Sequence, residues 1–239
     1  MLKNKIAIVT GASKGIGKAI ALDLAKAGVK LVLTARSEAL LKKLENKIIK
    51  MGGRAISIVC DMKNENDIIN LVQKTISTYK KIDILICNAG IGHFDLCENT
   101  RTSDFDEIMT INARAPFILF RECIPYLKKQ KKSFIIAIGS VVSVKGYANQ
   151  SAYSASKHAL MGMCKSMAKE VSNDGTRVHI ICPGGVDTEL VSRARPDLDT
   201  SVLMRAEEIS DAVHFLLTRK GKGVIDELHL HRESNIPFI

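Results

Sequence analysis

Short apolar segments alternate along the chain with longer segments in which apolar residues recur at helical spacing. The short segments are rich in Ile, Val and Leu and predict strands at residues 5–10, 30–35, 55–60, 82–87, 133–139, 177–182 and 224–229. The longer segments predict helices at residues 15–27, 38–51, 65–79, 104–129, 151–173 and 205–218. Several strands are almost continuously apolar, which is typical of a parallel sheet covered on both faces.

The alternation of strands and helices predicts an α/β fold: a doubly wound, Rossmann-type parallel sheet of about seven strands with helices on both faces. No linker-like or low-complexity stretch divides the chain, so we expect one domain over residues 1–239. Ligands of such sheets bind at the carboxyl ends of the strands. The residues that directly follow each strand are therefore the first candidates for a functional site.

Composition excludes several classes of protein. With 239 residues, 46% of them apolar and 25% charged, the chain can bury a sizeable core, so disorder is excluded. No apolar run approaches the roughly 20 residues of a membrane span, and the run at residues 6–9 is too short for an export signal. The six cysteines form no C-x-x-C pair and no cluster with histidine, which predicts reduced, mostly buried thiols, no metal and a cytoplasmic location.

The charge balance is basic, with 35 Lys and Arg against 25 Asp and Glu, and the net charge of +10 favours anionic partners. The most compact basic cluster, residues 128–132, is also typical of a helix end, and we favour that interpretation over a docking patch. With no Trp and only 4 Tyr to stack on bases, the chain is not expected to bind nucleic acid.

A glycine-rich turn, residues 10–17, joins the first predicted strand directly to the first helix. Glycines let the backbone turn tightly and approach a phosphate, which the free N–H groups of a helix start attract. Because the turn lies between strand and helix, we favour a dinucleotide site over a plain turn. The residues expected to line it are Gly11, Ser13, Lys14, Gly15, Ile16 and Gly17.

The second predicted strand ends at Arg36, where an NAD-binding domain usually offers an acid to the ribose hydroxyls. Because that acid is missing and a guanidinium forks well onto phosphate oxygens, Arg36 and Lys14 favour a 2′-phosphate over a pair of solvated cations. We therefore expect NADP(H) as the cofactor. Ordinary turn formers after the third and fourth strands complete the expected cleft: Asp61, Met62, Asn88, Ala89 and Gly90.

The type and spacing of three residues predict acid-base chemistry on a carbonyl group. Ser140 follows the fifth strand, and Tyr153 and Lys157, four positions apart, share one face of the next helix. An adjacent ammonium stabilises a phenolate, so we expect Lys157 to lower the pKa of Tyr153 from its usual value near 10. Ser140 would hold a substrate carbonyl oxygen beside the same phenol.

In order and spacing, these elements resemble the short-chain dehydrogenase/reductases, in their NADP-preferring branch, over residues 5–230. The resemblance implies that Asn112 joins Ser140, Tyr153 and Lys157 as a catalytic residue, and that the protein is a homodimer or homotetramer. It also implies further cofactor contacts at Pro183, Gly184, Val186 and Thr188, besides Tyr153 and Lys157.

The resemblance implies hydride transfer between nicotinamide and a carbonyl or secondary alcohol. Tyr153 would donate the proton, Ser140 would polarise the oxygen, and Lys157 would bind the ribose. Asn112 would hold a relay water, and Pro116, which has no N–H to give to the carbonyl of residue 112, would leave that carbonyl free.

Several alternatives stay open from the sequence. The substrate is either a small ketone or a 3-oxoacyl thioester on an acyl carrier protein or CoA. Residues 128–132 would be the docking site for a carrier protein. Asn173 and Asp174 argue against such docking, because carrier-dependent reductases of the family tend to have a further basic residue there. Two other hypotheses are that the protein oxidises an alcohol and that it is a non-catalytic regulator that binds NADPH. The segment 189–202 is short for a substrate lid. Pocket-edge candidates, equally explained by loop packing, are His93, Phe94, Tyr147, Asn149 and Gln150.

Overall fold

The computed structural model describes residues 2–194 and 199–234. Seven parallel strands form one sheet in the order β3-β2-β1-β4-β5-β6-β7. The strands are β1 Ile6–Thr10, β2 Lys30–Ala35, β3 Arg54–Val59, β4 Ile84–Cys87, β5 Ser133–Ile138, β6 Thr176–Pro183 and β7 Glu227–Leu230. The predicted doubly wound α/β fold is therefore confirmed.

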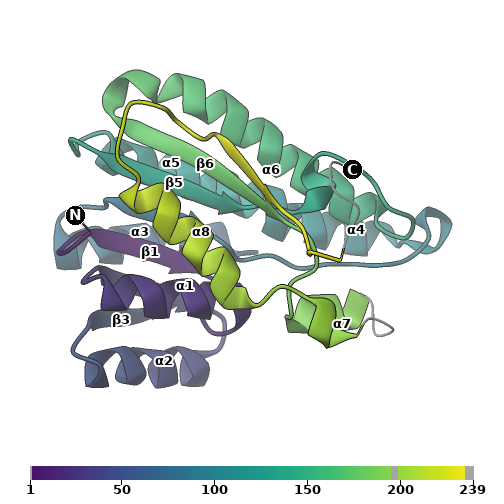
Figure 1. Cartoon of the computed structure of the whole chain (residues 1–239), viewed down its shortest axis with the longest axis horizontal. Helices are drawn as coiled ribbons and strands as arrows, with labels where there is room; N and C mark the ends of the chain where they lie inside the picture. The colour runs from purple at the N-terminus through teal and green to yellow at the C-terminus, as the bar shows by residue number, and fades with distance from the viewer. Residues whose placement is uncertain (1, 195–198, 235–239) are drawn as a thin grey trace.

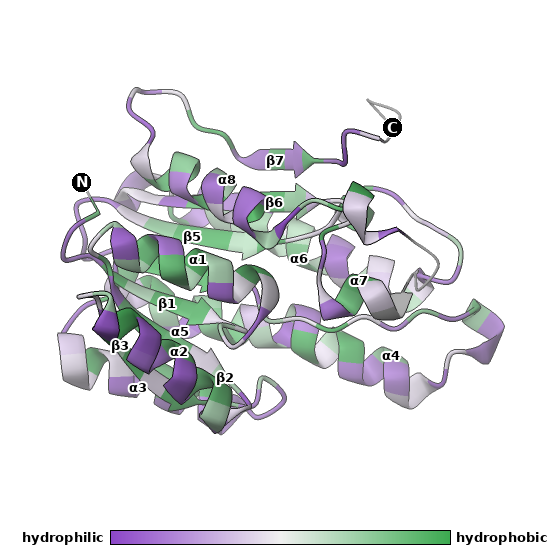
Figure 2. Cartoon of the chain, turned by 60° about the horizontal axis from the view of Figure 1, so that its bottom comes forward, coloured by the Kyte–Doolittle hydropathy of each residue, from purple (hydrophilic) through white to green (hydrophobic). Residues whose placement is uncertain are grey.

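Helices cover both faces of the sheet (Figure 1). One apolar core lies between the sheet and α1, α2 and α8, and a second lies between the opposite face and α3, α5 and α6. The helices are α1 Gly15–Lys26, α2 Glu38–Lys50, α3 Glu65–Tyr79, α4 Thr102–Met109, α5 Ala115–Leu127, α6 Ser151–Glu170, α7 Glu189–Ala194 and α8 Ala206–Thr218. In Figure 2 the central strands β1, β5 and β6 are largely green, whereas β7 is largely purple and the helices carry both hydrophobic and hydrophilic residues.

The predicted and observed elements differ most at two places, several other boundaries shift by one to three residues, and the short helix α7 was not predicted. The helix expected at 104–129 is interrupted by a π-helical turn, Thr110–Arg114, which separates α4 from α5. Pro116 lies just after this turn and cannot donate a backbone hydrogen bond, so regular α-helical bonding cannot continue through it. The last strand begins at Glu227 rather than 224, after a connection without regular structure.

The order of the strands creates a cleft. From β1 the chain builds outward through β2 and β3, and then returns to place β4 on the other side of β1. The connections after β1 and β4 therefore diverge at the carboxyl edge of the sheet, which is the switch point where doubly wound sheets bind ligands.

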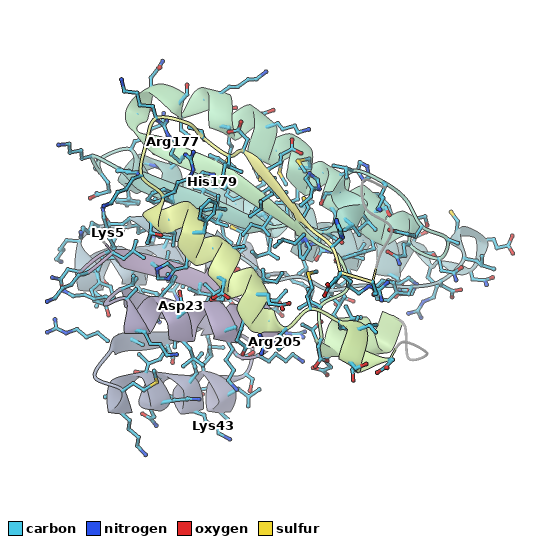
Figure 3. The ribbon with its side chains drawn as sticks, in the orientation of Figure 1. Lys5, Asp23, Lys43, Arg177, His179 and Arg205 are labelled. Carbon is cyan, nitrogen blue, oxygen red and sulfur yellow. The ribbon has the colours of Figure 1, made fainter. Side chains whose placement is uncertain are left out.

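The amino edge of the sheet is held by a buried carboxylate. Asp83, 1% exposed, accepts hydrogen bonds from Lys5 Nζ at 2.6 Å and from the Ile6 N–H at 2.9 Å, and pairs with Lys81 Nζ at 2.9 Å. Figure 3 shows Lys5 at this edge. Burial raises the pKa of Asp83, but these hydrogen bonds outweigh burial and hold the pKa below its usual value.

In the part of the chain that the structure describes, no helix is both long and apolar enough to cross a bilayer. Five of the six cysteines are buried, as predicted, and Cys97 is exposed.

Replacing Asp83 by Ala should lower the free energy of unfolding by about 3 kcal/mol, because it leaves the Ile6 N–H without its acceptor and deprives Lys5 and Lys81 of their carboxylate. Urea denaturation measures this change. Glu107→Ala is the matched control, since the Glu107–Lys63 pair is about half exposed on both sides and should contribute less than about 1 kcal/mol. Equal losses in the two variants would contradict the anchoring role of Asp83.

Candidate active site

A cleft of about 760 Å³ lies at the carboxyl edge of the sheet. It collects side chains from the segments that follow β1, β2, β3, β4, β5 and β6, together with α6 and α7. All the residues predicted for the cofactor and for catalysis line this cleft except Gly17 and Asn112. Both exceptions lie behind its wall, and both hold the wall in place.

The glycine-rich turn has the conformation that its sequence predicts. Gly11 and Gly15 adopt positive φ angles of 63° and 53°, which favour glycine. A Cβ on Gly17 would lie 2.4 Å from the Gly11 carbonyl oxygen and 2.5 Å from Asn88 Nδ2, so only glycine fits there. Helix α1 has no side-chain cap and no acid in its first turn, which leaves its first N–H groups for an anion.

The two turns that flank the switch point are tied to each other. The Asn88 amide donates to the carbonyls of Thr10 at 2.9 Å and Gly11 at 3.3 Å. The Thr10 hydroxyl accepts from the backbone N–H groups of Asn88 and Ala89 and donates to the carbonyl of Ile86. Asn88 therefore shapes the cleft through backbone contacts, and Thr10 is a positioning residue that the sequence prediction did not include.

Two cations line the side of the cleft formed by the segments after β1 and β2. Arg36 is exposed, and among the described residues it has no hydrogen-bond or ion-pair partner. Lys14 pairs with Glu189 at the start of α7, across the mouth of the cleft. This contact joins positions 175 residues apart, so no local sequence pattern could have indicated it. Part of the segment discussed above as a lid, residues 195–198, lies outside the described residues.

Asn112 is buried, with 1% of its surface exposed, in the π-helical turn. Its side chain accepts from the Ile91 N–H at 2.9 Å and donates to the Ile91 carbonyl at 2.8 Å. It also donates to the Ser156 hydroxyl at 3.0 Å, which in turn donates to the Tyr153 carbonyl. The Asn112 side chain thus positions both the loop after β4 and the helix that carries Tyr153.

Ser140, Tyr153 and Lys157 meet at the centre of the cleft. Tyr153 and Lys157 are 8% and 5% exposed, and Lys157 Nζ lies 5.8 Å from the centroid of the Tyr153 ring. Lys157 Nζ donates to the Ile138 carbonyl at 2.9 Å. Ser140 caps the short 3-10 turn that follows β5, so its backbone position is fixed by that turn.

The protonation states differ from the expected acidified phenol. Burial raises the pKa of Tyr153 to about 12, although its hydrogen bond with Ser140 lowers it in part. Burial lowers the pKa of Lys157 to about 8. The lysine is directed to the Ile138 carbonyl and lies over the phenol ring, and its attraction does not offset the desolvation of the phenolate. At neutral pH Tyr153 therefore carries its proton and Lys157 is mostly charged.

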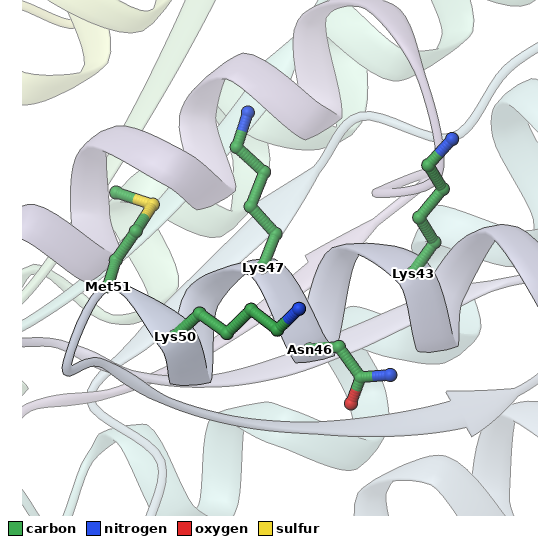
Figure 4. A pocket seen from close by; sticks show the side chains of 5 residues that line it. All are labelled: Lys43, Asn46, Lys47, Lys50 and Met51. Carbon is green, nitrogen blue, oxygen red and sulfur yellow. The ribbon is translucent and has the colours of Figure 1, made fainter.

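A second hollow, of about 490 Å³, lies on the outer surface of α2 (Figure 4). It is lined by Lys43, Asn46, Lys47, Lys50 and Met51. All five come from one helix and its C-terminal cap and none from the carboxyl edge of the sheet, so this hollow is separate from the cleft.

Comparison with known proteins agrees with this geometry. The model of the short chain dehydrogenase family matches residues 5–199. The 3-oxoacyl-(acyl-carrier-protein) reductase FabG of Rickettsia prowazekii is 33% identical, over 96% of this chain and 96% of the relative. The crystal structure of a metagenomic short-chain oxidoreductase in complex with NADP superposes with a TM-score of 0.85 at 30% identity, covering 98% of this chain and 99% of the other.

The alcohol dehydrogenase of Thermococcus sibiricus, complexed with 5-hydroxy-NADP, has a TM-score of 0.91 at 26% identity, with coverage of 98% of this chain and 99% of the other. The chain belongs to the short-chain dehydrogenase/reductase family. It is an oxidoreductase of the kind that uses a nicotinamide cofactor.

Gly17→Ala should weaken the binding of NADPH at least about tenfold, because the new methyl group must push the glycine-rich turn away from Asn88. Titration of NADPH fluorescence measures the dissociation constant, and circular dichroism verifies the fold. The control is Gly162→Ala in α6, where a Cβ meets no atom within 4 Å and should leave NADPH binding unchanged. Unaltered affinity in Gly17→Ala would show that the turn does not shape the cofactor site.

Proposed function

We propose that this protein is an NADPH-dependent reductase of carbonyl compounds in which Tyr153 donates the proton. The observation that carries this proposal is the pairing of a protonated, buried phenol with the Ser140 hydroxyl inside the cleft. A phenol that keeps its proton at neutral pH can give it to an oxygen that becomes an alkoxide, because an alkoxide is more basic than a phenolate, and this is the reducing direction. Oxidation of an alcohol by the same residues would first require that proton to leave.

The cleft fits a dinucleotide. The free backbone N–H groups at the uncapped start of α1 would bind the pyrophosphate, and the positive φ angles of Gly11 and Gly15 let the turn approach it closely. Arg36 would bind the 2′-phosphate. Lys14 would also bind this phosphate once its ion pair with Glu189 is broken. The bound cofactor would supply the hydride. The remaining predicted contacts would line the adenine and nicotinamide sides, as expected for Asp61, Met62, Ala89, Gly90, Pro183, Gly184, Val186 and Thr188.

The proton transfer depends on three side chains of this chain. Ser140 would donate to the carbonyl oxygen of the substrate and orient it toward the Tyr153 hydroxyl. As the proton leaves, the charge of Lys157 beside the ring would stabilise the developing phenolate in a site with little water. Asn112 acts through position, because both of its amide N–H groups donate to Ile91 and Ser156 and its amide oxygen accepts from Ile91. The relay role of its backbone carbonyl stays a prediction.

A second candidate substrate is a 3-oxoacyl thioester, which the printed names of relatives such as the Rickettsia reductase favour. The suggested docking cluster, residues 128–132, lies at the amino end of β5, whereas the cleft lies at its carboxyl end. A strand of this length spans about 20 Å. Lys128 also pairs with Asp174 at 2.9 Å. Within one chain this cluster is therefore remote from the cleft, so a carrier would need another surface or another subunit.

Tyr153→Phe should lower kcat for NADPH-dependent ketone reduction by at least about 100-fold, because it removes the proton donor and leaves the ring packing intact. The dissociation constant of NADPH should change little. Tyr147→Phe is the control, since Tyr147 is 46% exposed and does not line the cleft. If the wild-type protein binds NADPH but reduces no carbonyl compound of a broad panel, the hypothesis of a non-catalytic NADPH-binding regulator is supported instead.

Arg36→Ala should raise the dissociation constant of NADPH about 10- to 100-fold and leave that of NADH nearly unchanged, because only NADPH has the 2′-phosphate. Both constants come from fluorescence titration. Arg54→Ala is the control, because Arg54 is an exposed arginine at the start of β3, on the opposite edge of the sheet. Equal losses for the two cofactors would refute the role of Arg36 in NADPH preference.

A further inference from the structure

The loop after β4 places an aromatic ring against the phenol ring of Tyr153. The ring centroids of Phe94 and Tyr153 lie 5.6 Å apart, and the rings are tilted by 59°. Phe94 is half-buried and packs with Ile91 on a small apolar cluster that includes Tyr153 and Val142. Phe94 is not itself among the residues that line the cleft, but it packs on the ring that carries the Tyr153 hydroxyl, so a group bonded to a carbonyl carbon at that hydroxyl can extend toward this apolar wall.

The position of Phe94 is held from two sides. The backbone of Ile91 is bound in both directions by the Asn112 amide, which fixes the start of the loop. The edge of the Phe94 ring then lies directly on Gly92, where a Cβ would be only 2.4 Å from Phe94 Cζ. The same Cβ would lie 3.5 Å from Leu190 Cγ, so α7 approaches the same place. Phe94 and Leu190 thus contribute apolar surface from opposite elements.

The charges along the cleft are distributed unevenly. Among the described lining residues, the cations Lys14 and Arg36 lie on the side of β1 and β2. Beside Tyr153 the cation is Lys157, which already donates to a backbone carbonyl. The charged residues next to Leu190 are the acids Asp187 and Glu189. Among the described residues, a carboxylate bonded to the carbonyl carbon would therefore lose water and meet no cation other than Lys157, which already donates to the Ile138 carbonyl, and this is costly.

We propose that Phe94 is a specificity-determining residue that selects uncharged carbonyl substrates with an apolar group next to the carbonyl carbon, and that 2-oxo acids are rejected. This inference rests on the proposed carbonyl reductase function. The apolar group packs against the surface that Phe94 and Leu190 form together, and Gly92 is the positioning residue whose missing side chain lets the edge of the Phe94 ring lie on the backbone. A hydrophobic contact of this size changes discrimination by roughly 10- to 200-fold.

The test compares 4-phenyl-2-butanone, 2-butanone and 2-oxo-4-phenylbutanoate as substrates with NADPH. The first and third differ only by a methyl group in place of a carboxylate. Wild-type kcat/KM should be at least about 100-fold higher for the phenyl ketone than for the oxo acid. Phe94→Ala should lower kcat/KM for the phenyl ketone about tenfold, through KM, and for 2-butanone less than about twofold. Phe215→Ala, an exposed phenylalanine of α8, should change neither ratio.

A binding measurement without turnover accompanies the kinetics. In a Tyr153→Phe background with NADPH bound, Phe94→Ala should raise the dissociation constant of 4-phenyl-2-butanone by about the same factor as KM, as measured by ligand-observed NMR. Gly92→Ala, which displaces the ring, should shift the constant in the same direction. Should Phe94→Ala not fold by circular dichroism, Phe94→Leu is used, with a smaller loss in the same direction.

The outcomes separate the two proposals. A wild-type protein that reduces none of these carbonyls would refute the proposed function. The role of Phe94 alone would be overturned if the protein reduces both ketones but Phe94→Ala leaves unchanged the ratio of kcat/KM for 4-phenyl-2-butanone to kcat/KM for 2-butanone. Comparable turnover of 2-oxo-4-phenylbutanoate and its ketone would overturn the selection against acids.

Discussion

The architecture of the site depends on the hydrogen bonds of one buried amide. A primary amide without water must find protein partners for its donors and its acceptor, or lose free energy comparable to several hydrogen bonds. Asn112 finds them in the backbone of Ile91 and the hydroxyl of Ser156. Because those partners belong to the loop after β4 and to α6, satisfying the amide brings the apolar wall and the helix of Tyr153 into one arrangement.

Burial then sets the chemistry through opposite effects on two groups. It disfavours the charged form of each, so the pKa of Tyr153 rises to about 12 and that of Lys157 falls from 10.5 to about 8. For Lys157 this corresponds to about 3 kcal/mol of stability lost at neutral pH. Between pH 8 and 10.5 the Lys157 amine is protonated in the unfolded chain but largely neutral in the folded one, so the free energy of unfolding rises with pH through that window. The active lysine is thus held charged at a cost to the fold.

Much of this could be predicted from local pattern. Apolar strands, a glycine-rich turn and side chains directly after strands indicate the sheet and the residues of its cleft, because parallel strands bring their carboxyl ends together. The π-helical turn at 110–114 escaped prediction because it barely disturbs the apolar spacing of the surrounding helix. The contact between Lys14 and Glu189 depends on tertiary packing. The pKa of Tyr153 depends on desolvation, whereas a spacing of four residues indicates only proximity to Lys157.

The structure also changes what the sequence motifs mean. Asn88 and Asn112 stand in motifs that suggest contact with cofactor or substrate. The Asn88 side chain, however, bonds the backbone of Thr10 and Gly11, and the Asn112 side chain bonds the backbone of Ile91 and the hydroxyl of Ser156. Side chains of this kind align turns, and the turns present N–H groups and apolar surface to the ligand. Discrimination between substrates then falls to residues that lie on those aligned turns. Phe94 is such a residue, because its loop begins at the backbone that Asn112 holds.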